Sequence, residues 1–220
     1  MATCSNAQHH NDGHGKCYYQ APLKGNPVVA IFQCPGFWEN KVGAPAAGIT
    51  GYNLCRVFEC LRRLIKRDDE LPAGIEKRHL YKCRIMVTNA NDKVHGSNDR
   101  KSIIRKEMLE PMNLKRLQDE IKDARLVLCF GDLASEAYDS LRQQWKQEQK
   151  SMQIVIKTYH LSPKVFRLID IMCSKQNSSP ISYDMKIMFF AKYICDRLRN
   201  GGGEAFDGFR NFIQEKIKAK

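Results

Sequence analysis

The sequence predicts an α/β fold in three layers, α/β/α, with a central parallel sheet of four strands. Four short apolar runs rich in β-branched residues alternate with longer segments whose apolar residues recur at helical spacing. Parallel strands that are buried on both faces read as nearly continuous apolar runs, as these four do. Strands that alternate with helices favour a parallel sheet with helices on both of its faces.

The expected strands take in residues 27–33, 80–88, 125–130 and 152–158. The first ends in Cys34-Pro35-Gly36 and the third at Gly131-Asp132, residue types that commonly end a strand. The second leads into a polar loop over residues 89–100, and the fourth stops just before His160.

Helical spacing is clearest over residues 48–67, where apolar side chains form one face and basic side chains the other. Asp132 is expected to be the N-cap of a later helix. The remaining helices are expected at residues 102–109, 113–123, 133–145 and 183–199, with a short helix after the glycines at 201–203.

Residues 1–26 are expected to form a flexible N-terminal tail, residues 27–200 the main domain, and residues 201–220 a C-terminal helical extension. The tail contains side chains of the kinds that bind zinc, namely Cys4, His9, His10, His14 and Cys17. Their spacing matches no strong zinc pattern, and the surrounding residues are rich in Asn, Gln and Gly. A tail without a metal is therefore favoured over a zinc site.

The chain carries 36 Lys and Arg against 24 Asp and Glu, a formal net charge of +12. This excess favours a polyanionic partner, nucleic acid first, although a merely basic soluble protein is the alternative. No basic tract is long enough to act as a tail, so a basic face on the folded domain is expected. Nine cysteines without a Cys-x-x-Cys pair indicate a reducing, cytoplasmic setting, and no apolar run is long enough to span a membrane.

Polar segments follow three of the four expected strands directly. They are Gln33-Cys34-Pro35-Gly36, Asn89-Ala90-Asn91-Asp92 and His160-Leu161-Ser162. In parallel sheets the chemistry gathers at the carboxyl ends of the strands. The sequence therefore predicts one site at that edge of the sheet.

These segments resemble motifs of the uracil-DNA glycosylase superfamily, particularly its thermophile-type branch. The resemblance covers about residues 28–198 and consists of five pieces in the family's order. They are Gln33-Cys34-Pro35-Gly36-x-x-Glu39, Gly43-x-Pro45-Ala46-x-Gly48-x-x-Gly51, Val87-Thr88-Asn89, Val127 to Ala134 with Gly131-Asp132, and His160-Leu161-Ser162. The resemblance implies a glycosylase domain that flips a base out of DNA and cuts the bond to its sugar.

The resemblance also implies roles for individual residues. Asn89 would read the Watson–Crick edge of the base, and His160 would donate a hydrogen bond to the departing base. Without the resemblance, Asn89 could merely cap a turn and His160 could be an ordinary surface histidine. The implied base pocket is Gln33, Cys34, Pro35, Gly36 and Ala46, and the implied DNA contacts are Gly48, Gly51, Ser162, Lys164, Val165 and Phe166.

Lys164, Val165 and Phe166 follow His160 in a segment that resembles the family's minor-groove loop. They are candidate wedge residues that would fill the vacated place in the base stack. Phe166 could equally be a core residue.

Three departures from the family pattern bear on the substrate. Gln33 and Cys34 stand where a carboxylate is usual, so Asp92, Glu39 or neutral groups would have to orient the water. The iron–sulphur cysteines of the thermophile-type branch are missing, so no cofactor is expected. Ala46 stands where the family has a stacking phenylalanine, and Gly36 offers no side chain that would exclude a 5-substituent.

A pocket with these two changes suits a base larger than uracil. The favoured function is excision of a bulky 5-substituted cytosine, such as glucosylated hydroxymethylcytosine in phage DNA, as an antiviral defence. The alternatives are a uracil-DNA glycosylase of base excision repair and a catalytically inactive DNA-binding module. In each case the expected partner is double-stranded DNA. The protein is expected to be a monomer and to have no membrane partner.

Overall fold

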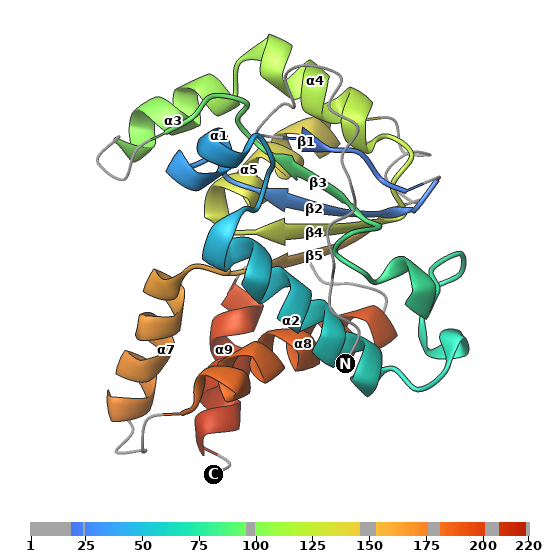
Figure 1. The fold of residues 1–220 in the computed structure, drawn as a ribbon, viewed down its shortest axis with the longest axis vertical. Coiled ribbons are helices and arrows are strands. Elements are labelled where there is room, and N and C mark those ends of the chain that lie inside the picture. The colour runs from blue at the N-terminus through green and yellow to red at the C-terminus, as the bar shows by residue number, and fades with distance from the viewer. Residues whose placement is uncertain are drawn as a thin grey trace.

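The computed structural model of the protein describes residues 19–23, 25–95, 100–145, 153–175, 181–200 and 207–218. These residues form a five-stranded sheet in the order β1-β3-β2-β4-β5 (Figure 1). Strands β2 to β5 are parallel, whereas β1 is antiparallel to β3. The strands are β1 (Tyr19–Gln20), β2 (Val28–Phe32), β3 (Met86–Asn89), β4 (Leu126–Phe130) and β5 (Ile154–Thr158). The predicted α/β class is confirmed, but the sheet is mixed and has five strands rather than four.

Two of the predicted boundaries were wrong. Strand β1 lies inside the segment predicted as a tail, where Tyr19 and Gln20 pair with Thr88 and Val87 of β3. The second predicted strand, residues 80–88, is shortened because the backbone N–H groups of Arg84 and Ile85 both donate to the carbonyl of Tyr81, at 2.9 and 3.1 Å. This turn uses backbone groups that a strand would offer to its neighbour.

Six helices lie where the sequence predicts them and in the predicted order, whereas the helices at Phe37–Val42 and Pro163–Lys175 were not expected. Helix α5 has Gly131 as its N-cap, so Asp132 is its first helical residue and not the predicted cap. The helices are α1 (Phe37–Val42), α2 (Gly48–Leu64), α3 (Lys101–Met108), α4 (Pro111–Ile121), α5 (Asp132–Gln144), α7 (Pro163–Lys175), α8 (Tyr183–Arg199) and α9 (Asp207–Lys218), with 3₁₀ turns at Asp68–Glu70 and Lys77–His79.

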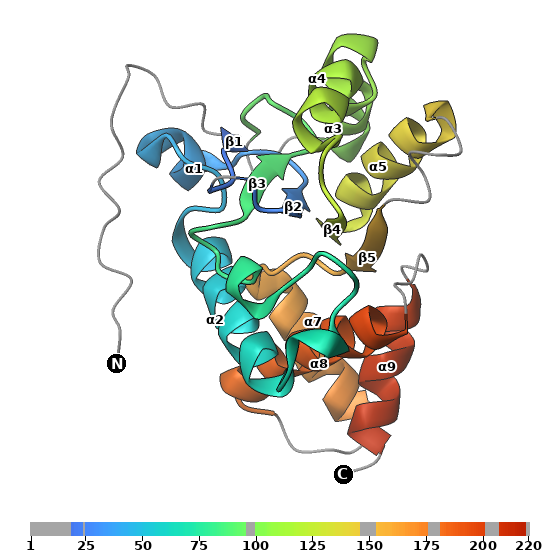
Figure 2. The same ribbon diagram turned by 90° about the vertical axis from the view of Figure 1, so that its right-hand side faces the viewer.

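Alternate residues of the central strand β2 face two separate hydrophobic cores. Val28, Ala30 and Phe32 pack with apolar residues of α2, α8 and α9. Val29 and Ile31 point the other way and pack with α4 and α5. Figures 1 and 2 show these two groups of helices on opposite sides of the sheet. Burial on both faces explains why β2 is apolar throughout.

None of the helices in the described ranges is both long enough and apolar enough to cross a membrane. The C-terminal extension predicted at residues 201–220 contains α9, whose Phe209 and Ile213 are buried in the core with α2 and α8. This helix is therefore packed against the main domain.

The start of α2 is fixed by a tight turn and by a contact with the loop after β5. Ala46 has a left-handed backbone with a φ of 48°. A Cβ on Gly51 would lie only 1.7 Å from the carbonyl oxygen of Ala46, so this close approach requires glycine. Two residues further on, the Asn53 amide donates to the carbonyl of Leu161 at 2.8 Å.

We predict that Gly51→Ala lowers the free energy of unfolding by about 2–3 kcal/mol, because the added methyl meets backbone that cannot move aside cheaply. Urea denaturation followed by circular dichroism measures this difference. The neighbouring substitution Thr50→Ala is the control and should change stability by less than about 0.5–1 kcal/mol. Equal stabilities of the two variants would contradict the proposed close packing.

Candidate functional site

The loops that follow β2 and β3 lie side by side at the carboxyl edge of the sheet. The backbone N–H groups of Ala90 and Asn91 donate to the carbonyls of Phe32 and Gln33, at 2.7 and 2.9 Å. Further out, the N–H of His95 donates to the carbonyl of Pro35 at 3.0 Å. The structure therefore brings the 33–36 and 89–92 segments together.

Asn89 is the last residue of β3 and is buried. It is level with Phe32 across the β2–β3 pair. Behind it, the Arg116 guanidinium donates to the Asn89 carbonyl at 2.8 Å and to the Glu120 carboxylate at 2.8 and 2.9 Å. Thr88 also donates to Glu120, at 2.6 Å. This partly buried network holds the end of β3 in place.

His160 lies two residues after β5, with its ring edge-on to Phe32 at a centroid distance of 5.5 Å. Phe32 in turn stacks on Phe130 at 4.9 Å. Asn89 and His160 thus both lie next to Phe32, one through the strand pairing and one through the ring contact. Burial lowers the pKa of His160 to about 4, against an opposing effect of Asp132. The imidazole is therefore neutral near pH 7 and can donate one hydrogen bond.

Asp132, which the sequence predicted as a helix N-cap, supplies a further carboxylate at this edge. It follows β4 by two residues, as His160 follows β5, and Phe130 and Thr158 are paired in register. Its Oδ1 accepts from Gln33 Nε2 at 2.9 Å and from the Leu133 N–H at 3.0 Å, and its Oδ2 pairs with Lys101. Asp132 and His160 each lie two residues after strands whose ends are paired. This equal spacing in the sequence could have predicted that the two side chains lie close together.

Asp132 is ionised at neutral pH. Burial alone would raise the pKa of its carboxyl, but the hydrogen bond and positive charge of Lys101, together with backbone N–H groups, lower it below its usual value. The contact with Gln33 depends on Gly131, which has a φ of 104° and whose Cβ, if present, would lie 2.6 Å from Gln33 Nε2. Gln33, predicted as a pocket residue, therefore holds Asp132.

Glu39 and Asp92, which the sequence suggested as water-orienting groups, lie in two different segments, helix α1 and the loop after β3. Glu39 Oε2 accepts from the Gly36 N–H at 3.1 Å and supports the loop. Asp92 is half-buried in the loop after β3. Its neighbour Asn91 is buried and donates toward Glu107 at 3.3 Å.

The remaining base-pocket candidates are Cys34, Pro35, Gly36 and Ala46. Pro35 is buried, whereas Cys34 and Gly36 are half-buried at the site edge. Ala46 is 2% exposed and packs within the hydrophobic core beside α2. Of the two small residues that suggested a roomy pocket, Gly36 is thus the one that borders the loops of the site.

The segment predicted as a wedge begins helix α7. Phe166 is 3% exposed and packs against Tyr183 and Phe190, at centroid distances of 4.9 and 5.8 Å. The prediction of Phe166 as a DNA-contacting wedge was therefore wrong, because its ring belongs to the core. Lys164 is exposed, and Val165 is half-buried against the same core.

Ser162 accepts backbone hydrogen bonds at the start of this helix. Its carbonyl receives the N–H groups of Val165 and Phe166, at 3.1 and 3.2 Å, while Ser162 itself is half-buried. Of the two glycines predicted to contact DNA, Gly48 is exposed and Gly51 is buried under the turn at Ala46. Gly51 therefore serves the packing of α2.

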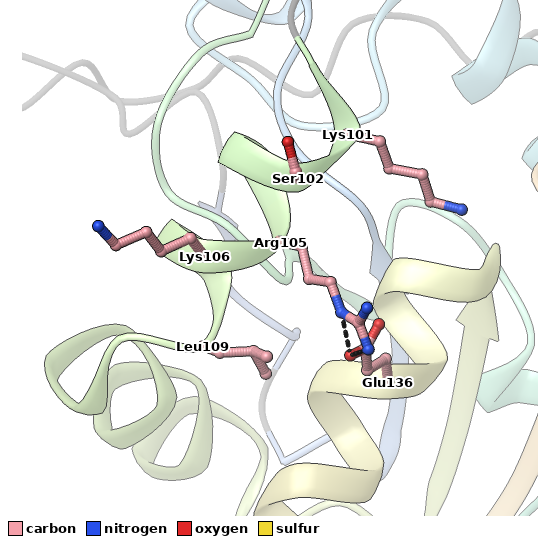
Figure 3. Close-up of a pocket in the computed structure, with 6 residues that line it drawn as sticks. All are labelled: Lys101, Ser102, Arg105, Lys106, Leu109 and Glu136. Carbon is pink, nitrogen blue, oxygen red and sulfur yellow. Dashed lines mark hydrogen bonds and ion pairs between the residues drawn. The ribbon is translucent and has the colours of Figure 1, made fainter.

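A pocket of about 530 Å³ lies between α3 and α5, beside the site rather than at Asn89 and His160. Its walls are largely basic, and Figure 3 shows the Arg105 guanidinium bonded to Glu136, with an Nε to Oε1 distance of 2.6 Å. Lys101 connects this pocket to the site because it is also the partner of Asp132. The lining residues are Lys101, Ser102, Arg105, Lys106, Leu109 and Glu136.

The candidate zinc ligands Cys4, His9, His10, His14 and Cys17 lie outside the described residues. Among the residues that are described, no group of three or more His, Cys, Asp or Glu side chains is placed to hold a metal ion.

We predict that His160 makes stability depend on pH. Its pKa in the folded chain, about 4, lies below the ordinary value of 6.5, so the unfolded chain binds a proton that the folded chain excludes. The resulting stability is fully present above the unfolded pKa and is lost as the pH falls toward the folded one. Between about pH 7 and pH 5 the wild type should lose about 1–2 kcal/mol more than His160→Gln in urea denaturation. Equal losses would contradict the buried, neutral imidazole.

Neither the models of known protein families nor the curated proteins match this sequence. What the chain does must therefore be inferred from its own residues and their geometry.

Proposed function

We propose that this protein is a monofunctional DNA glycosylase with the three-layer fold of the uracil-DNA glycosylase superfamily. It flips a modified pyrimidine out of double-stranded DNA, cuts the bond to the sugar and leaves an abasic site. The observation that carries the proposal is the placement of Asn89 and His160 on either side of Phe32, at the carboxyl edge of a largely parallel sheet. The helices on both faces of that sheet support the proposed layering.

In the proposed reaction the base leaves with the electron pair of its bond to C1′, so negative charge develops on the base. Asn89 binds the polar edge of the base, since an amide offers both donors and an acceptor. The neutral His160 donates a hydrogen bond to the charged oxygen of the departing base, where a preorganised donor is typically worth a few kcal/mol. Water adds to C1′, and the proton that it loses ends on the released base.

Asp132 provides the carboxylate that the first motif lacks. As the bond breaks, positive charge develops on the sugar, and an ionised carboxylate stabilises such a cation and orients the incoming water. Asp132 suits this role because it is ionised, half-exposed and held by Gln33, and because His160 feels its charge. Gln33, which stands at the family's carboxylate position, then acts as a positioning residue.

The proposed substrate is a bulky 5-substituted cytosine, such as glucosylated hydroxymethylcytosine in phage DNA, and the proposed setting is antiviral defence. Gly36 supports a large substituent, because it borders the site without a side chain. The basic pocket lined by Lys101 and Lys106 offers contacts for the phosphate backbone next to the site.

The function is tested by incubating the protein with unmodified DNA, uracil-containing DNA and DNA carrying glucosylated hydroxymethylcytosine. Alkaline cleavage reveals abasic sites, and mass spectrometry identifies the released base. Release of the glucosylated base supports the proposal, and release of uracil alone would assign the chain to base excision repair. DNA binding without release of any base would leave only a DNA-binding module.

We predict that Asn89→Ala and His160→Ala each lower the rate of base release by at least about a hundredfold, because each removes a contact made in the transition state. Single-turnover assays measure the rate, and circular dichroism checks that the variants fold. His79→Ala is the control, since His79 caps a 3₁₀ turn remote from the carboxyl edge and should keep the wild-type rate. Wild-type rates of base release in both Asn89→Ala and His160→Ala would contradict the proposed site.

We also predict that Asp132→Asn lowers kcat about 10- to 100-fold with little change in KM, because the carboxylate acts on charge that develops only in the transition state. Asp132→Glu should restore part of the rate. Glu136→Gln is the matched control, as Glu136 lies on the same helix and also pairs with a cation of α3. Equal losses in the Asp132 and Glu136 variants would indicate a structural role for both.

A further inference from the structure

Large apolar side chains are exposed next to the candidate site, on α1 and near the start of α2. Phe37 is 69% exposed and Trp38 is 57% exposed. Trp38 and Val42 are four residues apart on α1, and Ile49 and Tyr52 are three apart on α2, so each pair shares a helix face. The α1 patch is the set Phe37, Trp38, Val42, Ile49 and Tyr52.

Trp38 lies between two segments that the sequence assigns to the site. Gly36, the N-cap of α1, is two residues before it. A Cβ on Gly48 would lie 3.8 Å from Trp38 Cβ and Cγ, so the side chain leaves α1 over the start of α2. Phe37 supports the indole edge-on, at a centroid distance of 5.5 Å. Figures 1 and 2 both show α1 next to the beginning of α2.

The charges around the α1 patch fit a polyanion. Lys41 Nζ lies 5.2 Å from the centre of the Trp38 ring, and Lys82 Nζ donates to the Ala46 carbonyl at 3.2 Å. Within the described part of the chain neither lysine forms an ion pair. Of the nearby carboxylates, Glu39 binds the Gly36 N–H, and Asp184 pairs with Arg56 at 2.9 Å. The patch therefore combines flat aromatic rings with positive charge.

We propose that Trp38, supported by Phe37, stacks on an unpaired base of the DNA that is bound at the site. Aromatic side chains beside cations are the common way in which proteins hold unstacked bases. An enzyme that extrudes one base exposes the faces of its neighbours, and the buried ring of Phe166 cannot cover them. The proposal rests on the proposed function and names the surface that contacts the disrupted strand.

Trp38 is also a natural reporter for this contact. The sequence contains two tryptophans, and Trp145 is 6% exposed and edge-on to Tyr138. The variant Trp145→Phe leaves Trp38 as the single tryptophan. Its emission is followed during titration with a duplex that contains one mismatched pair and with the fully paired duplex, while fluorescence anisotropy of a labelled strand reports binding separately.

Stacking predicts saturable quenching of Trp38 emission, stronger with the mismatched duplex. Trp38→Ala in the otherwise wild-type chain should weaken binding of the mismatched duplex by about fivefold or more, and Trp38→Phe should restore most of it. The salt dependence of binding should stay unchanged in both variants, because no charge is removed. Met112→Ala is the control, as Met112 is 86% exposed on α4 and is not part of the patch.

The outcomes separate this proposal from the proposed function. Binding by anisotropy without quenching would overturn the stacking and leave the glycosylase proposal standing. Quenching that depends on protein concentration without DNA would overturn the stacking in favour of a second copy on the patch. Absence of DNA binding would overturn both. Normal quenching with no base release would keep the stacking and overturn the excision.

Discussion

The candidate site depends on the fixed position of Phe32 at the end of the central strand. Strand β2 is hydrogen-bonded on both sides and is buried along its whole length, so its end cannot shift without disturbing both cores. Phe32 contacts the last residue of each neighbouring strand, Asn89 through pairing and Phe130 through stacked rings. The His160 ring packs edge-on against the same Phe32 ring. One buried phenylalanine therefore sets the spacing between the groups that would bind the base.

The surroundings at this edge give His160 and Asp132 different charge states at neutral pH. Burial keeps His160 neutral, whereas Lys101 and backbone N–H groups keep Asp132 charged although it is partly buried. In the proposed reaction, the neutral histidine would stabilise the departing base and the carboxylate would stabilise the positive charge on the sugar. The Gln33–Asp132–Lys101 contacts also tie β2 and β4 to α3, so the carboxylate is held by both partners.

Much of the fold could be predicted from the sequence, because buried parallel strands and long amphipathic helices leave strong apolar patterns. Helix α1 was missed since its six residues are too few for a periodic signal and expose their apolar side chains. The role of Phe166 was ambiguous, because an aromatic residue at this place in the sequence could serve either as a wedge in DNA or as part of the core. Asp132 was predicted as a cap, since capping is local whereas its contacts with Gln33 and Lys101 join residues 99 and 31 positions apart. Asn89 and His160 could be singled out because each stands near the end of an apolar run, in a segment that resembles a glycosylase motif.

The edge strand β5 carries a lysine, Lys157, whose side chain points toward helix α5. Strand β5 is paired with β4 and is the last strand of the described sheet, and its Lys157 is 6% exposed. The lysine reaches Asp139 of α5 at 2.6 Å. An inward-pointing charge on an edge strand disfavours growth of the sheet, since a strand added there would cover an ion pair that now keeps partial contact with water. This ion pair thereby protects the β5 edge from pairing with a strand of a second chain.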